Sequence, residues 1–402
     1  MATKDLKLRI ALLCESFGAL GGVAQIVEEL ALQFARAGHR VVIVSNQHKG
    51  ASMVRCRPPS IEHLWIDLPR AKPFSLRHPE RLWRRRTAPE LTTFIRAWSP
   101  NLIHIHGGLR DRFPAVLKAC RQTGIPFVQS FHLVPEPPRE DAEASRMKSF
   151  AAMALNSASA ITVPSAAVKQ GLQKIWPEAE RAHIIRGGVN LEAAAHATPF
   201  TRHRPYIFSA SRLDLHHKAL DVVIEAFRLI AAEFPEIDLL IAGDGPQRPE
   251  VEAMIGAFKL EQRIHLLSSL PHSELWSLYK GASMFIMLSR MAEGLPLVFF
   301  EAMACSLPVI GTRNGGTPEI VVHGETGVLI ESNEPGCAAA AMRSLLASPG
   351  RREEMGRNGY ELAKVYDWQA VAVSYVAQYQ QLVGAPKDSV PTGNRYSSNL
   401  LV

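Results

Sequence analysis

Short apolar runs and helical stripes alternate along the first half of the chain. Residues 8–14 form an apolar run, and apolar side chains at helical spacing follow Gly21 and Gly22: Val23, Ile26, Val27, Leu30, Ala31, Phe34 and Ala35. Further strand-like runs lie at 41–45, 102–105, 127–131, 160–163 and 183–185. Strands that alternate with helices are typical of parallel sheets covered on both faces. The pattern therefore predicts a doubly wound α/β domain.

The same alternation repeats in the second half, with a helical stripe between 220 and 232 and apolar runs at 206–209, 239–242, 264–267, 284–288, 309–311 and 327–330. Residues 191–205 show no clean period and are interpreted as a linker. A chain of 402 residues is long for one domain. We expect domains at 1–195 and 200–366, an amphipathic helix at 367–385 and a disordered tail at 386–402.

Two glutamates stand out in the second half. Glu293 lies in a polar loop after the run 284–288, and Glu301 lies about one turn into the apolar helix that follows. A strand, a Gly/Pro-containing loop and a helix start form an anion site at the carboxyl edge of a parallel sheet. The backbone around Gly294, Leu295, Leu297 and Val298 would point at phosphate, and the carboxylates would accept hydroxyls. A ligand with phosphate groups beside hydroxyl groups is a nucleotide sugar. The alternative for Glu301 is a solvated side chain, which is the commoner role of an isolated carboxylate on a helix.

Two cations follow an earlier strand of the same half. Arg212 comes just after the run 206–209, and Lys218 precedes the next helix. Two fixed cations at a strand's carboxyl end suit a diphosphate, and a plain surface loop is the alternative. Gly245 lies in a strand-to-loop turn, where a glycine permits a ligand to approach the backbone closely. A plain turn without a ligand contact is the alternative. The loop 314–319 is a further helix start aimed at the same edge.

The first half offers glycines and histidines as candidate site residues. Gly21 and Gly22 open the first helix, but their spacing does not match a dinucleotide-binding glycine fingerprint. His106 ends one strand and His132 follows another, and each has a structural alternative as a satisfied strand-end histidine. The sequence has no Asp-x-Asp and no His/Cys/carboxylate cluster at metal-ligand spacing. No metal and no cofactor are therefore predicted.

Composition and charge indicate the cellular compartment and the kinds of partner. Five scattered cysteines without metal spacing favour a reducing, cytoplasmic environment. The apolar run near the N-terminus is interpreted as a first strand rather than a signal peptide. The segment 70–86 concentrates positive charge: Arg70, Lys72, Arg77, Arg81, Arg84, Arg85 and Arg86. It suits an anionic membrane surface or an anionic acceptor, or it is a solvated face. No nucleic-acid-reading motif accompanies it.

The run Glu293-Gly-Leu-Pro-Leu-Val-Phe-Phe-Glu-Ala-Met-Ala-Cys305 is followed by Leu-Pro-Val-Ile-Gly-Thr, Gly-Gly-Thr-Pro-Glu-Ile and Gly-Glu-Thr-Gly-Val-Leu. In order and spacing these motifs resemble the donor-site signature of glycosyltransferase family 4. The likeness covers roughly Leu8 to Val383. It implies the GT-B fold, with two Rossmann-like domains facing across a cleft, and a retaining transferase that needs no metal.

The resemblance also implies roles for matching residues. Glu293 would lie beside the donor sugar's hydroxyls, and Glu301 would bind the ribose. Arg212 and Lys218 would hold the diphosphate and stabilise the leaving group. Among the remaining positions, the first-helix glycines would contact donor and acceptor, His132 the transferring sugar and His106 the acceptor side, and the helix 367–385 would pack back on the first domain.

Four positions depart from the common pattern. Ser211 and Ala219 replace glycines on either side of the two cations, and Pro296 occupies a frequent glycine position. Arg186 stands where an asparagine is common before the following glycine. Pro296 removes one amide donor to the ligand, so a shift in donor preference is expected.

The predicted function is hexosyl transfer from a nucleoside-diphosphate sugar, with uridine diphosphate favoured by family frequency, to a hydroxyl acceptor. A cell-envelope or exopolysaccharide acceptor is favoured, and the basic residues 70–86 suit a lipid-linked one. A small natural product as acceptor is the first alternative. A glycosyl phosphorylase, a nucleotide-sugar hydrolase and a non-catalytic nucleotide-sugar-binding protein on the same fold remain open. A nicotinamide oxidoreductase would need the missing glycine fingerprint.

Overall fold

The computed structural model describes most of the chain, namely residues 6–14, 21–46, 61–66, 89–107, 112–135, 142–331 and 333–384. The basic segment 70–86 and the tail 386–402 lie outside these ranges, so the predictions made for them stay predictions. The chain divides into two compact units. The first takes residues up to Pro164, Val168–Ile185 and the chain from Val371, and the second takes Ser165–Ala167 and Arg186–Ala370.

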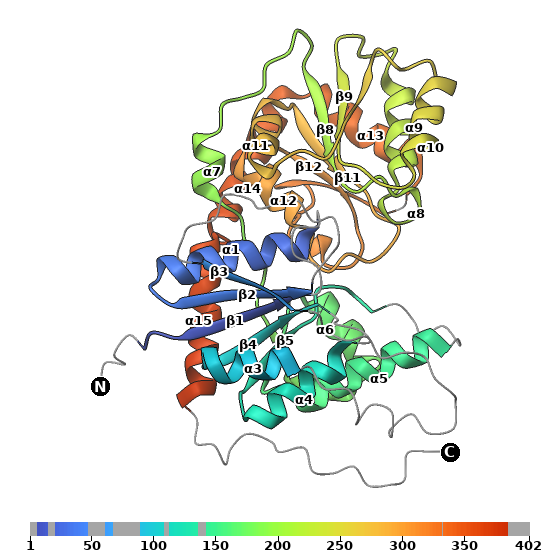
Figure 1. Ribbon diagram of the computed structural model, residues 1–402. Coiled ribbons are helices and arrows are strands. Elements are labelled where there is room, and N and C mark those ends of the chain that lie inside the picture. Colours follow the sequence, from blue (N-terminus) through green and yellow to red (C-terminus); the bar gives the residue numbers. More distant parts are fainter. Residues whose placement is uncertain are drawn as a thin grey trace. The chain divides into compact units, whose positions relative to one another are not determined.

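The first unit is built on a seven-stranded parallel sheet (Figure 1). The strands, in spatial order, are β3 (Ile61–Ile66), β2 (Arg40–Asn46), β1 (Arg9–Cys14), β4 (Leu102–His106), β5 (Phe127–Ser130), β6 (Ala160–Val163) and β7 (His183–Ile184). Its helices are α1 (Gly22–Arg36), α3 (Pro89–Trp98), α4 (Phe113–Thr123), α5 (Ala142–Ser157), α6 (Ala166–Gln173) and the 3₁₀ turn η2 (Pro177–Arg181). The strand order reverses between β1 and β4, which is the topological switch point of a doubly wound sheet.

The second unit repeats this plan on a six-stranded parallel sheet. Its strands, in spatial order, are β10 (Ile264–Leu267), β9 (Asp238–Ala242), β8 (Tyr206–Ala210), β11 (Met284–Met287), β12 (Val309–Thr312) and β13 (Gly327–Ile330). The helices and turns are α7 (Leu191–His196), α8 (Leu215–Lys218), α9 (Leu220–Ile230), α10 (Arg248–Ala257), α11 (His272–Gly281), α12 (Leu297–Ala304), η3 (Thr317–Glu319), α13 (Pro335–Leu346) and α14 (Pro349–Lys364). The order reverses between β8 and β11.

Each sheet buries apolar side chains on both faces, as parallel sheets require. In the second unit, α9, α10 and α13 cover one face, and α11, α12 and α14 cover the other (Figure 1). In the first unit, α3, α4 and α5 supply one apolar layer. On its other face, Phe34 of α1 meets Tyr379 with ring centroids 5.7 Å apart. The predicted doubly wound α/β architecture is confirmed for both halves.

The last helix, α15 (Trp368–Gly384), contributes residues to both units. In the second unit, the backbone amide of Trp368 donates to the carbonyl of Val189 at 3.1 Å. In the first unit, Tyr379 is buried, and its hydroxyl lies 2.5 Å from Nδ1 of His104 in β4. The other ring nitrogen of His104 lies 2.6 Å from Ser130 Oγ at the end of β5. Polar groups inside the first unit thus fix where α15 packs.

Two local predictions were wrong or incomplete. The segment interpreted as a structureless linker contains α7, whose first turn is capped by Asn190: its Oδ1 accepts from the amide of Ala193 at 2.8 Å. An asparagine cap before an alanine-rich stretch is a helix-start signal that the missing apolar period concealed. Strand β3 had not been predicted, because only its first and last residues, Ile61 and Ile66, are buried.

Candidate active site

Lys218 ends α8, the single-turn helix that follows β8. Since the strand order reverses between β8 and β11, the loops after these strands flank the switch point, where ligands bind to open α/β sheets. Lys218 Nζ lies 2.7 Å from Oε1 of Glu293, which belongs to the loop between β11 and α12. These side chains are only 22% and 16% exposed. The structure therefore unites the predicted cation and the predicted carboxylate in one part-buried ion pair.

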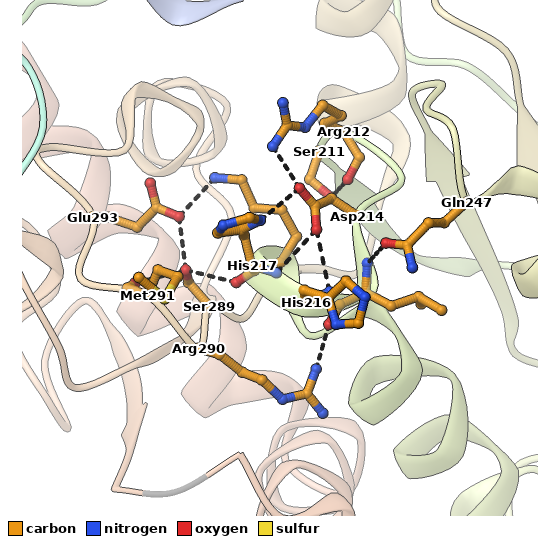
Figure 2. Close-up of polar contacts among 12 residues, drawn as sticks. Ser211, Arg212, Asp214, His216, His217, Gln247, Ser289, Arg290, Met291 and Glu293 are labelled. Carbon is orange, nitrogen blue, oxygen red and sulfur yellow. Dashed lines mark hydrogen bonds and ion pairs between the residues drawn. The ribbon is translucent and has the colours of Figure 1, made fainter. Parts of the chain in front are cut away.

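Ser289 joins the two loops beside this ion pair. Its hydroxyl oxygen lies 2.8 Å from Glu293 Oε1 and 3.0 Å from the carbonyl oxygen of His217 (Figure 2). A hydroxyl carries one proton, so it donates to one of these acceptors at a time. The backbone amide of Arg290 donates to the same His217 carbonyl at 2.8 Å. The loop that carries Glu293 is thus hydrogen-bonded to the last turn before Lys218.

The loop at 314–319 supports Glu293 through its backbone. The amide of Gly316 donates to the carbonyl oxygen of Glu293 at 2.8 Å. Gly315 has a φ of +51°, and a Cβ at this position would lie 2.2 Å from that same oxygen. Glycine is therefore required here, both for the backbone conformation and for the close approach.

Gly245 lies on the opposite side of α8, in the turn after β9. A Cβ on Gly245 would lie 2.4 Å from the carbonyl oxygen of Leu213, which is the residue after Arg212. The backbone of Leu213 also donates to the carbonyl of Asp244 at 3.0 Å. These contacts explain Gly245 by the close packing of two loops, and its direct contact with a donor stays a prediction.

Arg212 extends from the loop between β8 and α8 and is 61% exposed. Its Nη2 lies 2.5 Å from Oδ2 of Asp214, a carboxylate that the sequence analysis did not single out. Burial of Asp214 favours its neutral form, but hydrogen bonds from the amide and ring of His217 and from Arg212 outweigh this effect. They hold the pKa of Asp214 at about 2. Arg212 and Lys218 therefore each have a carboxylate partner.

Helix α12 begins at Leu297, because Pro296 occupies the N-cap with a ψ of 106°. No side chain caps this helix, so the predicted backbone donors at Leu297 and Val298 lie in an uncapped first turn. Gly294 is buried, and its carbonyl accepts from Ser165 Oγ at 2.7 Å. Leu295 is partly buried beside it. These positions lie where an anion-binding helix start requires them.

Glu301 is 3% exposed, which excludes the solvated helix carboxylate considered above. The hydroxyl of Tyr279 donates to its Oε2 at 2.8 Å, and Nε2 of His272 lies 2.9 Å from its Oε1. Burial, and then the neighbouring Glu301, raise the pKa of Tyr279 well above its usual range. His272 and Tyr279 lie on α11, and no sequence motif had pointed to either residue.

In the first unit, the histidines at the carboxyl ends of β4 and β5 form a cluster. His106 Nδ1 lies 3.2 Å from His132 Nε2, and the two rings stack with centroids 5.4 Å apart. The ring of His104 is tilted against that of His106, with centroids 3.9 Å apart. Burial lowers the pKa of His132 to about 4. Burial, with smaller effects of neighbouring imidazoles, lowers the pKa of His104 and His106 as well. The cluster is therefore neutral near pH 7.

The outer nitrogens of this histidine pair, His106 Nε2 and His132 Nδ1, are buried. Neither has a hydrogen-bond partner among the described residues. Unsatisfied buried polar atoms are rare in folded proteins and often mark a functional contact. Gly21 and Gly22 open α1 of the same unit without a side-chain cap, and Cβ atoms added to them would meet nothing within 4 Å in the part of the chain that the structure describes. Their contact with a donor stays a prediction.

The described ranges contain neither a metal-binding cluster nor a membrane-spanning helix. No group of three or more His, Cys, Asp and Glu side chains is placed to hold a metal ion within them. Within the same ranges, no helix is both long and apolar enough to cross a lipid bilayer.

Two doubly wound sheets, with a cation and a carboxylate paired at the switch point of the second, define a two-domain α/β protein with a candidate ligand site in its second unit. Known families agree with this description. The model of the family described as Glycosyltransferase Family 4 matches residues 20–193, and the model described as Glycosyl transferases group 1 matches residues 192–362. Together the two models account for most of the chain, which belongs to this family of glycosyltransferases.

Individual proteins give the same classification. A mannosyltransferase from Mycolicibacterium smegmatis, named as GDP-mannose-dependent and acting on phosphatidylinositol monomannoside, is 31% identical over 172 residues, which are 41% of this chain and 44% of that protein. The match thus spans less than half of that relative.

Two solved structures share the fold. Sucrose-phosphate synthase from Thermosynechococcus elongatus superimposes with a TM-score of 0.76 at 21% identity over 94% of this chain and 100% of that one. Anabaena HepE, solved in complex with UDP-glucose, gives 0.75 at 18% identity over 93% and 100%.

Proposed function

We propose that this protein is a retaining glycosyltransferase that moves a hexose from a nucleoside-diphosphate sugar to a hydroxyl acceptor. The observation that carries the proposal is the pairing of Lys218 with Glu293 at the switch point of the second sheet. A diphosphate needs a cation, and a sugar hydroxyl needs an acceptor. This ion pair offers both within 2.7 Å, beside the uncapped start of α12.

The proposed chemistry breaks the bond between the anomeric carbon and the diphosphate oxygen. Lys218, Arg212 and the first amides of α12 stabilise the negative charge that develops on the leaving diphosphate, which is often the largest catalytic term. The acceptor oxygen bonds to the anomeric carbon on the face that the diphosphate leaves. The acceptor's proton passes to an oxygen of the departing diphosphate. Glu293 accepts a hydroxyl of the transferred sugar.

Ligand binding must rearrange the ion pairs. Lys218 and Glu293 neutralise one another, as do Arg212 and Asp214. An arriving diphosphate competes with Glu293 for Lys218, and the released carboxylate oxygen becomes free to accept a sugar hydroxyl. One exchange thereby prepares both the phosphate site and the sugar site. A nucleotide without a sugar offers no hydroxyl to the Glu293 carboxylate that it releases from Lys218.

We propose uridine diphosphate as the nucleotide. Its frequency in the family supports it, and HepE, which shares the fold, was solved with UDP-glucose. The Mycolicibacterium relative is named for GDP-mannose, so guanosine diphosphate is the competing ligand. Thermal-shift titrations with UDP, GDP and ADP, followed by transfer assays with sugar variants of the nucleotide that binds, test the proposal. A stabilisation by UDP with sugar transfer supports it, and no response to any nucleoside diphosphate contradicts it.

We further propose that the enzyme works without a metal ion, in the cytoplasm, on a cell-envelope or exopolysaccharide acceptor that is lipid-linked. Arg212 and Lys218 take the place of a metal, so we expect sugar transfer to persist in excess EDTA. A loss of transfer in EDTA would show that the diphosphate depends on a divalent cation and would contradict this proposal. The basic segment 70–86 supports a lipid-linked acceptor. Salt-sensitive binding to phosphatidylglycerol vesicles but not to phosphatidylcholine vesicles is expected, and equal binding to both contradicts the membrane contact.

A further inference from the structure

Asp214 is a carboxylate at the centre of the donor-side loops for which neither the sequence motifs nor the proposed chemistry has a use. It is 8% exposed, and both of its oxygens are occupied (Figure 2). Oδ1 accepts from the amides of His216 and His217 at 3.1 and 3.0 Å. Oδ2 accepts from His217 Nδ1 at 2.8 Å and from Arg212 at 2.5 Å. A group this fully engaged has a definite orientation.

These contacts fix the backbone that carries Lys218. Helix α8 has only four residues, and a single helical turn is not stable on its own. Asp214 caps its first turn with two accepted amides, and its own carbonyl accepts the amide of Lys218 at 2.9 Å. The side chain and the main chain of Asp214 therefore fix the backbone position from which the Lys218 side chain extends.

The same carboxylate restrains Arg212 directly. The guanidinium group is mostly exposed, and Asp214 is the side chain with which it pairs. An unrestrained arginine loses rotamer entropy when a ligand immobilises it. A charge-assisted hydrogen bond that exists before the ligand arrives removes part of this cost. Asp214 thus touches one cation and supports the backbone of the other.

We propose that Asp214 is a positioning residue that pre-orients both Arg212 and Lys218 for the leaving diphosphate. The inference rests on the proposed function and extends it to a residue that does not itself contact the donor. It makes a distinctive prediction, because Asp214 is also negatively charged. Removing it misplaces two cations, which slows the reaction, but it also removes a charge that repels the diphosphate. Turnover should therefore fall, while nucleotide affinity should stay equal or rise.

Asp214→Ser separates these effects from capping, because serine caps helices as well as aspartate does but cannot reach Arg212. We expect kcat to fall about 10²-fold, as for catalytic groups displaced by about 1 Å, while the Kd of UDP or GDP measured by calorimetry stays equal or tightens. Asp367→Ser is the matched control, because Asp367 caps α15 by accepting the amide of Gln369 at 2.8 Å. It should lose comparable thermal stability and keep its turnover.

Three outcomes would overturn the inference: a kcat for Asp214→Ser within twofold of the Asp367→Ser value, a nucleotide Kd that weakens in parallel with kcat, or simple additivity with Arg212→Ala. Residues that act together give a double-mutant effect smaller than the sum. If Asp214→Ser does not fold, Asp214→Asn supplies the same readouts, because asparagine also caps but turns an amide donor towards Arg212. A wild-type protein that binds neither UDP nor GDP contradicts the proposed function itself, whatever these variants do.

Discussion

The two units share one strand plan but carry opposite chemistry at the carboxyl ends of their strands. In the second unit, two ion pairs involve Arg212, Asp214, Lys218 and Glu293. In the first unit, the corresponding strand ends carry the cluster around His106, whose imidazoles are neutral near pH 7. A common scaffold therefore positions side chains, while their chemistry is chosen independently in each unit.

This difference matches the two kinds of group that a sugar transfer must handle. A diphosphate carries charge throughout the reaction, so positioned counter-charges suit it. Sugar and acceptor hydroxyls are neutral and both donate and accept hydrogen bonds, so uncharged imidazole nitrogens suit them. The buried outer nitrogens of His106 and His132 are then the first unit's counterpart of the ion pairs in the second. The comparison predicts that substitutions in the two units fail in different ways.

The largest effect is expected for Lys218→Ala. This change removes the cation that stabilises the leaving diphosphate, and losing one such preorganised group costs about 10²–10³-fold in kcat. Steady-state kinetics with the preferred donor measure the effect. Lys174→Ala, an exposed lysine on the first unit, is the control and should keep full activity. Unchanged turnover of Lys218→Ala would remove Lys218 from the mechanism.

The next effect concerns the loop that supports Glu293. Gly315→Ala forces a Cβ to within 2.2 Å of the Glu293 carbonyl oxygen, so the loop must shift. We expect a loss of at least about 2–3 kcal/mol in unfolding free energy, together with most of the activity. Gly324→Ala is a close control, because Gly324 also has a positive φ, +87°, but open space around it. It should cost about 1 kcal/mol and leave kcat intact. Equal behaviour of the two variants would contradict the supporting role of Gly315.

The smallest effect is a pH dependence of stability that originates in the first unit. Folding lowers the pKa of His132 from about 6.5 to about 4, so between these values the unfolded chain binds a proton that the folded chain does not. The free energy of unfolding should therefore fall as the pH falls through this window, by at most about 1.4 kcal/mol per pH unit for this one histidine.

Urea unfolding at a series of pH values measures this slope. His132→Gln should flatten the slope, whereas His183→Gln, which changes an exposed histidine of β7, should not. A slope that is the same in all three proteins would show that the cluster is not buried in its neutral form. Because His132 is neutral from about pH 5 upwards, it should add no pH dependence to turnover between pH 6 and 8.

The sequence was sufficient to predict which strand ends meet. Arg212, Lys218 and Glu293 each follow an apolar run, and parallel strands bring such positions to one edge. It could not predict that Lys218 would pair with Glu293, because side-chain conformations depend on the packed loops. His272 and Tyr279, which hold Glu301, come from a helix whose pattern indicates only burial.

Asp214 is an intermediate case. An aspartate directly before a helical turn is a recognised cap signal, so its contact with the amides of α8 was available from the sequence. Its contact with Arg212 was not, because it depends on how the chain turns after β8. Glycine requirements divide in the same way: Gly315 is explained by backbone atoms of a loop more than twenty residues earlier in the chain, which no local pattern reports.

A crystal structure with the intact sugar nucleotide, or with the nucleoside diphosphate and the sugar together, tests the central claim most directly. We predict that Lys218 Nζ will leave Glu293 and bind a phosphate oxygen, while Glu293 accepts a hydroxyl of the sugar. A diphosphate that binds elsewhere, with the ion pair between Lys218 and Glu293 intact at 2.7 Å, would contradict the account.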